Sequence, residues 1–425
     1  MRCCLNVVSS SNDYENRTFG LRAQDVFENL FEERKRFLDY ARNDKAFGAK
    51  ARISAENLDN TIKHCIFAAM NGKMNEQALL YPLLFKPNLH TVVWGGGQLR
   101  PYKGMPPSDE PIGESWEVSA VPSSMSVVSN GMWKGLDLGF VIKEMPEAIL
   151  GKAVNRKYHS QLPLLVKFID AKKDLSIQVH PNDEMAMREH GKMGKSEMWY
   201  VIKAEEGAHL YAGFKQEITP FEYQKHVENG TITDVLADHQ VKAGDVFYLP
   251  AGRVHAICGG ILLAEVQQSS DVTYRIYDYN RPGLDGKPRE LHTELAAQAL
   301  DFHVEQNYRT VYPEMANHAT QIIDTPYFDV RVMEVSKPFH RDLRKYDSFI
   351  ITMCIEGDCV IHVRSTGDEV LLKTGHSTLI PAAIADFDVI PQQGKTRILD
   401  AFIDNRDSRI ATMITRFFHF SESSF

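Results

Sequence analysis

The sequence predicts a mainly β protein with two antiparallel barrels of the jelly-roll type, small helical insertions and a helical N-terminal extension. Three observations support this prediction. From residue 81 onward, short apolar or alternating segments are separated by Gly, Pro, Asn and Asp, which is typical of many short strands joined by turns. The same pattern appears a second time near the C-terminus, and residues near the N-terminus follow helical periodicity instead.

The N-terminal extension is assigned to residues 1–76. Within residues 21–46, apolar side chains recur at roughly helical spacing between charged positions, and residues 51–72 are a candidate second helix. Two interpretations of residues 1–73 stay open. They are either a helical appendage that packs on the barrel or mediates self-association, or a stretch that lies upstream of a natural start at Met74.

The first barrel is predicted within residues 77–320. Its expected strands are residues 90–94, 115–121, 164–169, 175–180, 198–204, 245–250 and 261–268. Helical insertions are expected at residues 182–191, 219–230 and 291–302. Thr219 and Thr293 are the candidate N-caps of the last two, because a threonine hydroxyl can accept a hydrogen bond from the first turn of a helix.

A second barrel is predicted within residues 321–425. Its expected strands lie in residues 325–335, 348–363 and 370–383. Gly375-x5-Pro381 repeats the spacing of Gly244-x5-Pro250, which indicates an internal repeat. The second copy has no histidine where the first has His255. We therefore expect a metal-free barrel whose role is packing.

Composition and charge exclude several classes of partner. The chain has 48 basic and 56 acidic residues, a formal charge of −8 and no run rich in Lys and Arg, which argues against nucleic acid or a membrane surface as the main partner. Six scattered cysteines without a Cys-x2-Cys pair indicate a reduced, cytoplasmic chain. No apolar stretch reaches the ~18 residues of a spanning helix.

Four residues in three strand-like blocks form a candidate metal site: Gln178, His180, Glu197 and His255. Side chains two apart on a strand share a face, so the Gln-x-His pair can direct both polar groups at one ion. A carboxylate and a second imidazole from neighbouring strands can complete the ligand set. This mixture suits Zn²⁺, one ion per chain, with Fe(II) or Mn(II) as second choices.

The order of the motifs resembles a known family. The blocks are LSIQVHPND (175–183), GKSEMWY (194–200), PAGRVHA (250–256) and SSDVTYRIYDYNR (269–281). Together they are similar to class I mannose-6-phosphate isomerase, also called phosphomannose isomerase, of the cupin superfamily. The resemblance implies a double cupin and a zinc-dependent enzyme that interconverts D-mannose 6-phosphate and D-fructose 6-phosphate through a cis-enediol.

Lys195 is the candidate proton carrier of such an isomerase. It lies two residues before Glu197, so on a strand it shares the face of that ligand, and a nearby cation and burial favour the neutral amine. The family has a lysine at this spacing. Two neighbours differ from the family pattern, because Gly194 stands where some members have His and Ser196 stands where Pro is usual.

The resemblance implies further roles for five polar residues. It places Glu265, Asp271 and Arg275 at the substrate pocket, with Arg275 near the reacting oxygens or the phosphate. It also implies that Lys167 and Ser176 contact the phosphate or the sugar hydroxyls. Asp271 and Arg275 are an even number of residues apart, so on one strand they face the same side.

Two rival functions stay open. One is an Fe(II) cupin oxygenase or a related phosphosugar epimerase, against which the glutamine ligand weighs. The other is a non-catalytic metal- or sugar-binding cupin. In that case Lys195, Glu265, Asp271 and Arg275 are charges on inward faces without an explanation.

Overall fold

A computed structural model of the chain describes residues 79–406. The predicted extension, residues 1–76, and its candidate start Met74 lie outside the described residues. Residues 80–406 belong to one compact unit. Within residues 79–406, every helix is too short or too polar to span a lipid bilayer.

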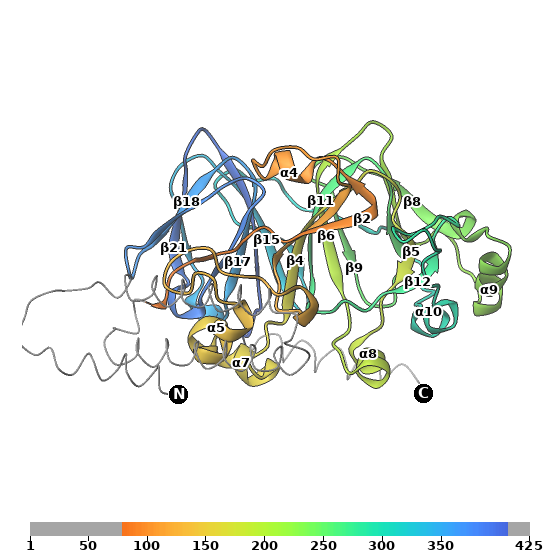
Figure 1. Cartoon of the computed structure of the whole chain (residues 1–425), viewed down its shortest axis with the longest axis horizontal. Helices are drawn as coiled ribbons and strands as arrows, with labels where there is room; N and C mark the ends of the chain where they lie inside the picture. The colour runs from red at the N-terminus through yellow and green to blue at the C-terminus, as the bar shows by residue number, and fades with distance from the viewer. Residues whose placement is uncertain (1–78, 407–425) are drawn as a thin grey trace, which may run out of the picture. The chain divides into compact units, whose positions relative to one another are not determined.

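The first barrel is a sandwich of two antiparallel sheets (Figure 1). Its strands are β2 (Leu89–Gly96), β3 (Ile112–Val118), β4 (Leu164–Ala171), β5 (Ile177–Val179), β6 (Glu197–Ala204), β7 (His209–Phe214), β8 (Leu236–Gln240), β9 (Val246–Leu249), β10 (His255–Ile257), β11 (Ile261–Gln268), β12 (Tyr274–Tyr277) and β13 (Arg309–Thr310). In the described part of the chain, one sheet has the order β13-β9-β6-β11-β4-β2-β3 and the other the order β12-β5-β10-β7-β8. Trp199 and Phe247 of the first sheet share an apolar core with Leu210 and Ile257 of the second.

The second barrel repeats this construction (Figure 1). Its strands are β1 (Leu83–Leu84), β14 (Thr320–Asp324), β15 (Asp329–Val335), β16 (Phe339–Asp342), β17 (Ile350–Glu356), β18 (Cys359–Val363), β19 (Glu369–Leu372), β20 (Ser377–Ile380), β21 (Asp386–Pro391) and β22 (Thr396–Phe402). Over residues 79–406, the sheet orders are β1-β20-β17-β22-β15-β14 and β16-β21-β18-β19. A core that includes Ile350, Phe387 and Phe402 lies between the sheets.

The two barrels confirm the predicted fold class, a mainly β double cupin with few helices. The limits drawn at residues 77–320 and 321–425 stay a prediction. They separate β1 from the sheet to which it belongs, because β1 pairs with β20 through Leu83 and Leu379. The first described strand of the chain therefore contributes to the sheet of the second barrel.

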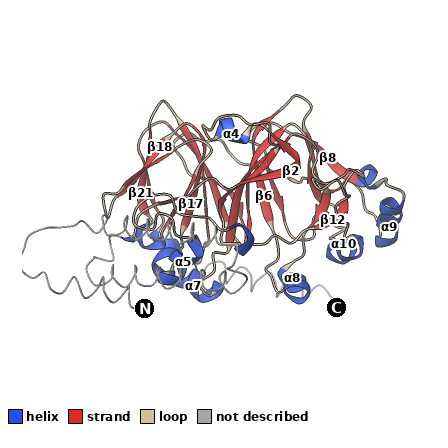
Figure 2. Cartoon of the chain, viewed as in Figure 1, coloured by secondary structure: helices blue, strands red, loops and turns tan. Residues whose placement is uncertain are grey.

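The helices lie outside the strands of the sheets (Figure 2). They are α4 (Leu99–Tyr102), α5 (Leu138–Glu144), α6 (Pro146–Leu150), α7 (Lys152–Tyr158), α8 (Asp183–His190), α9 (Pro220–Glu228) and α10 (Thr293–Ala299). Thr219 caps α9 as predicted, in a reciprocal pair with Glu222. The prediction for Thr293 was wrong, because it is the first helical residue and His292 is the N-cap. The N–H of His292 donates to the carbonyl of Arg275, which ties that residue to β12.

The repeated Gly-x5-Pro spacing corresponds to one repeated structural unit. Gly244 and Gly375 have φ angles of +89° and +74°, in the left-handed region that favours glycine. In each copy a strand, β9 or β20, separates the glycine from the proline. The next strand begins at His255 in the first barrel and at Asp386 in the second. The repeat therefore starts the next strand with a polar residue in each barrel. This residue is a histidine in the first barrel and an aspartate in the second.

Candidate active site

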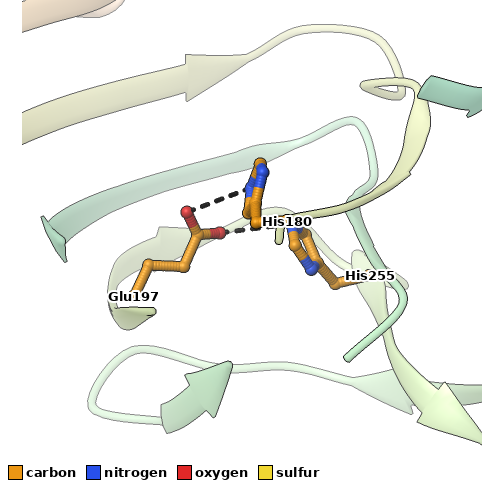
Figure 3. A group of neighbouring side chains, drawn as sticks. All are labelled: His180, Glu197 and His255. Atoms are coloured by element: carbon orange, nitrogen blue, oxygen red, sulfur yellow. Dashed lines mark ion pairs between the residues drawn. The ribbon is translucent and has the colours of Figure 1, made fainter. Parts of the chain in front are cut away.

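The two predicted histidine ligands and Glu197 converge inside the first barrel (Figure 3). Glu197 is the first residue of β6, His255 is the first residue of β10, and His180 follows β5 directly. All three side chains are buried. The potential ligand atoms lie within 4.8 Å of one another. Three segments distant in sequence thus bring two imidazoles and one carboxylate to a single point.

Both carboxylate oxygens of Glu197 are buried and lack a hydrogen bond from the described residues, although the Lys195 ammonium lies close to one of them. Its Oε2 lies 3.4 Å from His180 Nε2, and its Oε1 lies 3.2 Å from His255 Nε2. Lys195 Nζ is 2.8 Å from Oε2, yet neither oxygen accepts a well-directed hydrogen bond. Buried carboxylate oxygens normally have such partners. A divalent cation held by these three side chains fits this arrangement.

Backbone contacts fix both imidazoles in a form suited to metal binding. Nδ1 of His180 lies 2.9 Å from the carbonyl oxygen of Val272, and Nδ1 of His255 lies 2.8 Å from that of Arg253. A carbonyl oxygen only accepts hydrogen bonds, so each Nδ1 carries the proton and donates it. The Nε2 lone pairs therefore point toward Glu197, as metal-ligating histidines require.

Burial keeps these imidazoles neutral. It lowers the pKa of His180 to about 3, with a further contribution from the ammonium of Lys195. Burial also lowers the pKa of His255. For Glu197, burial alone would raise the pKa, but Lys195 and His180 outweigh it, so the pKa lies well below its usual value. The set is two neutral nitrogen donors and one carboxylate anion.

Gln178 lies beside this group on β5. It is paired in register with His255 on β10, and its Nε2 lies 3.4 Å from Nε2 of that residue. The oxygen and nitrogen of a glutamine amide occupy nearly equivalent positions, and rotation of the amide exchanges them. In the rotated form Oε1 faces the histidine nitrogen, where a fourth ligand oxygen is expected.

A cavity of about 190 Å³ opens beside the group. Its polar lining residues are Glu114, Lys167, Ser176, Gln178, Lys195, Glu265, Ser270, Asp271, Thr273, Arg275 and Arg289. Every residue that the sequence singled out for the substrate thus lies on its wall. The cavity provides both charged groups and hydroxyls, which suits a polar, anionic ligand.

Lys195 is buried at the inner end of this cavity. Its Nζ lies 3.1 Å from His180 Nε2, in addition to the contact with Glu197. The preceding Gly194 has no room for a side chain, because an added Cβ would lie 2.6 Å from backbone atoms of Asn182 and Asp183. A histidine at this position therefore requires a different local backbone.

Lys167 is held between two carboxylates. Its Nζ lies 3.2 Å from Glu265 and 3.7 Å from Glu114, and it stands 4.9 Å from the centre of the Trp116 ring. Burial alone would lower the pKa of Lys167, but the two carboxylates outweigh it and raise the pKa. The pKa of Glu265 is raised, chiefly by burial. One Glu265 oxygen accepts a hydrogen bond from Trp199, and the other accepts none.

The expectation that Asp271 and Arg275 share a strand face was wrong. Strand β12 begins at Tyr274, so Asp271 lies in the loop before it. The Asp271 carboxylate forms an ion pair with Lys192 instead, at 2.6 Å. Arg275 is on β12, and its Nε donates to Ser176 Oγ at 3.2 Å. Both residues nevertheless line the cavity.

Sequence reasoning missed two charged residues of the cavity wall. Glu114 lies on β3, and its carboxylate accepts a hydrogen bond from Trp116 Nε1 at 2.6 Å. Glu114 and Trp116 are two residues apart in IGESWEV (112–118), so on a strand they share a face. This spacing could have predicted that Glu114 faces inward. Arg289 lies in the loop before α10. No spacing in the sequence marks it, because the contact depends on the fold of that loop.

Comparisons with known proteins agree with this geometry. Residues 83–214 match the family described as phosphomannose isomerase type I, catalytic domain. Residues 318–401 match the cupin domain of mannose-6-phosphate isomerase. The mannose-6-phosphate isomerase ManA of Bacillus subtilis is 36% identical over 72% of this chain and 95% of its own length. That of Streptococcus mutans is 37% identical over 60% of this chain and 79% of its own length.

Solved structures give the same result. The crystal structure of mannose 6-phosphate isomerase from Bacillus subtilis superposes with a TM-score of 0.68 and 31% identity, covering 75% of this chain and 99% of that one. A putative mannosephosphate isomerase from Archaeoglobus fulgidus superposes with a TM-score of 0.62 over 76% of this chain and 98% of that one. At 23% identity, the second likeness shows the fold alone.

Proposed function

The chain belongs to the phosphomannose isomerase type I family, and we propose that it interconverts D-mannose 6-phosphate and D-fructose 6-phosphate with one Zn²⁺ per chain. The observation that carries the proposal is the buried group of His180, Glu197 and His255 at the end of a charged cavity. Two imidazoles and a carboxylate are a common ligand set of catalytic zinc sites. Gln178 is the proposed fourth ligand.

Zinc would supply a Lewis acid that polarises sugar oxygens beside these ligands. The reaction itself moves a proton between C1 and C2 of the open-chain sugar through a cis-enediol. The chain must therefore place a proton carrier beside those carbons and keep bulk water away. The buried inner end of the cavity, where Lys195 lies, meets both requirements.

Lys195 is the proposed proton carrier. Its Nζ is within 3.1 Å of one proposed ligand and 2.8 Å of another, so a sugar oxygen bound there lies close to the amine. Glu265 is the proposed second acid or base, because its buried carboxyl has a raised pKa and one oxygen without a hydrogen bond. Asp271 is the weaker candidate, since Lys192 neutralises it at the surface.

The remaining polar residues are proposed to hold the substrate. Ser176 and Arg275 already contact each other on the cavity wall, and both can donate to sugar or phosphate oxygens. Lys167 forms ion pairs with two carboxylates, which offset its positive charge. We therefore assign it to a sugar hydroxyl rather than to the phosphate. The substrate is thus a small phosphosugar, as the family implies.

We also propose the domain limits 1–76, 77–320 and 321–425, with strand β1 as the one exception that joins the sheet of the second barrel, and a cytoplasmic location. The location is supported by the reduced state of the described cysteines Cys258, Cys354 and Cys359, all buried and without a disulfide.

A coupled assay for fructose 6-phosphate formation from mannose 6-phosphate tests the proposal. Protein purified without added metal should turn over the substrate and contain one zinc per chain by elemental analysis. Binding of the phosphosugar without turnover would establish a non-catalytic cupin instead. Iron in the protein together with oxygen consumption would establish an oxygenase.

A further inference from the structure

Three arginines gather around one aspartate near the more exposed end of the cavity. Asp278 accepts hydrogen bonds from Arg281 at 2.9 and 3.1 Å, and from Arg289 at 2.6 and 2.7 Å. Arg275 lies nearby and lines the cavity together with Arg289. Arg281 does not line it and stands against the Tyr279 ring instead.

The cluster has an excess of positive charge. Arg275, Arg281 and Arg289 contribute three guanidinium cations, against the two carboxylates of Asp278 and Glu290. Within residues 79–406, Arg275 donates to neutral acceptors alone, Ser176 Oγ and the backbone carbonyl of Glu290. Desolvation, followed by repulsion from Arg289, lowers the pKa of Arg275. An anion placed between Arg275 and Arg289 would relieve this repulsion.

The register of three strands places the backbone of Arg275 two strands away from that of His255. Arg275 on β12 is opposite Gln178 on β5, which is opposite His255 on β10. Neighbouring strands lie ~4.8 Å apart, so the backbones of Arg275 and His255 are about 10 Å apart. An open-chain hexose 6-phosphate has its carbonyl and its phosphate at opposite ends of a chain of comparable reach.

The two lysines of the cavity wall are paired with carboxylates at the inner end. Lys167 lies between Glu114 and Glu265, and Lys195 lies against Glu197. The inner end of the cavity is therefore rich in carboxylates, whereas the arginine end is rich in cations. At the arginine end Arg289 uses Nε and Nη2 for Asp278, so in the described structure its Nη1 remains for a phosphate oxygen. Arg275 hydrogen-bonds no carboxylate among the described residues, so a phosphate dianion is favoured at this end.

We propose that Arg289, held in position by Asp278, binds the phosphate group of the substrate beside Arg275 and so directs the carbonyl end of the sugar toward His180, Glu197 and His255. The guanidinium of Arg289 is a planar donor that matches phosphate oxygens. The inference rests on the proposed function for the identity of the sugar, but not for the binding of phosphate.

Arg289→Gln tests the proposal, with Arg281→Gln as the matched control. Both variants remove one guanidinium from Asp278, but only the first removes a cation from the cavity wall. In Arg289→Gln, kcat/KM for mannose 6-phosphate should fall by ~10- to 100-fold through KM, the usual effect of losing one charge-assisted hydrogen bond. The dissociation constant of inorganic phosphate, measured by calorimetry, should rise by a similar factor. Arg281→Gln should change both values by less than threefold.

The possible outcomes distinguish the phosphate site from the proposed isomerase function. If Arg289→Gln isomerises and binds phosphate like the unaltered chain, the phosphate site is wrong and the proposed function stands. If the unaltered chain binds phosphate through Arg289 but forms no fructose 6-phosphate, the site stands and the isomerase assignment fails. Equal losses in both variants would mean that only the general charge of the cluster matters, which also overturns the role of Arg289. Arg289→Lys should recover part of the affinity, and its zinc content reports whether the fold is intact.

Discussion

Replacement of Lys195 by methionine separates proton transfer from metal binding. Methionine keeps an unbranched apolar stem of similar length, so the buried volume is largely retained. The substitution removes only the ammonium that lies 2.8 Å from Glu197 Oε2 and 3.1 Å from His180 Nε2. With zinc bound, Glu197 keeps a cationic partner, and the fold and the metal content should be unchanged.

We expect a large loss of the proton-exchange rate because no other amine on the described cavity wall is placed to replace that of Lys195. Lys167 is the other lysine on the described cavity wall, and its Nζ is held between Glu114 and Glu265. A positioned acid–base group contributes ~10²–10⁴-fold to a rate. This equals about 3–5 kcal/mol of activation free energy, at ~1.4 kcal/mol for each factor of ten. Exchange of the substrate C2 proton with solvent should fall by that factor.

The assay is proton exchange into substrate in deuterated water, followed by NMR, with zinc content measured on the same sample. Lys203→Met is the control, because Lys203 is an exposed lysine on the same strand, β6. Exchange near the unaltered rate in Lys195→Met, with a raised KM, would refute the reasoning. Lys195 would then bind substrate, and Glu265 would become the principal candidate for the base.

Three further predictions concern the metal, the pH and the extension. His180→Ala and His255→Ala should each abolish activity and lower the zinc content together, because loss of one protein ligand breaks the site; full zinc occupancy in both would contradict the ligand assignment. When a chelator has removed any metal, the pKa of His180 in the folded protein lies at about 3. This is below the pKa of ~6.5 that a histidine has in an unfolded chain. The unfolded state therefore takes up the proton first as the pH falls, and the free energy of unfolding should decline between pH ~6.5 and ~3. Between pH 7 and pH 5 the contribution of His180 to this decline is about 2 kcal/mol. In urea titrations the decline should be smaller by that amount in His180→Asn, which keeps the contribution of His255; equal slopes for both proteins would refute it. Finally, a chain that begins at Met74 should keep its isomerase activity in the coupled assay, because every residue placed at the cavity lies beyond it; a folded but inactive product would show that the extension acts at the site.

The proposed metal ligands could be predicted from the sequence because their signals are local. The Gln-x-His pair lies at the two-residue spacing of a strand face, and a glycine and a proline flank the strand before His255. These patterns depend on neighbouring residues alone. The Cα register between Gln178 and His255 then brings the pair to its partner, as expected.

Other features depend on distant parts of the chain. Strands β10 and β12 have only three and four residues, too few for alternation to be read, so the start of β12 was misjudged and Asp271 was placed on it. Helices α5, α6 and α7 were not predicted. Arg289 lies at the cavity because of the path of the loop that precedes α10, and its ion pair with Asp278 holds it there. Neither contact has a spacing that a single sequence reveals.

The pairing of β1 with β20 has a consequence for how the protein is made. Leu83 and Leu379 are joined across nearly the whole described chain, and Thr378 Oγ1 also donates to the carbonyl of Leu83. During synthesis the first strand must wait for the last barrel to emerge before it finds its partner. A fragment that contains only residues 321–406 would expose the backbone of β20 as an open sheet edge, which is a template for aggregation. The second barrel is therefore not an independent module that can be cut away or transplanted at residue 321, and a transplant would have to carry the β1 segment with it.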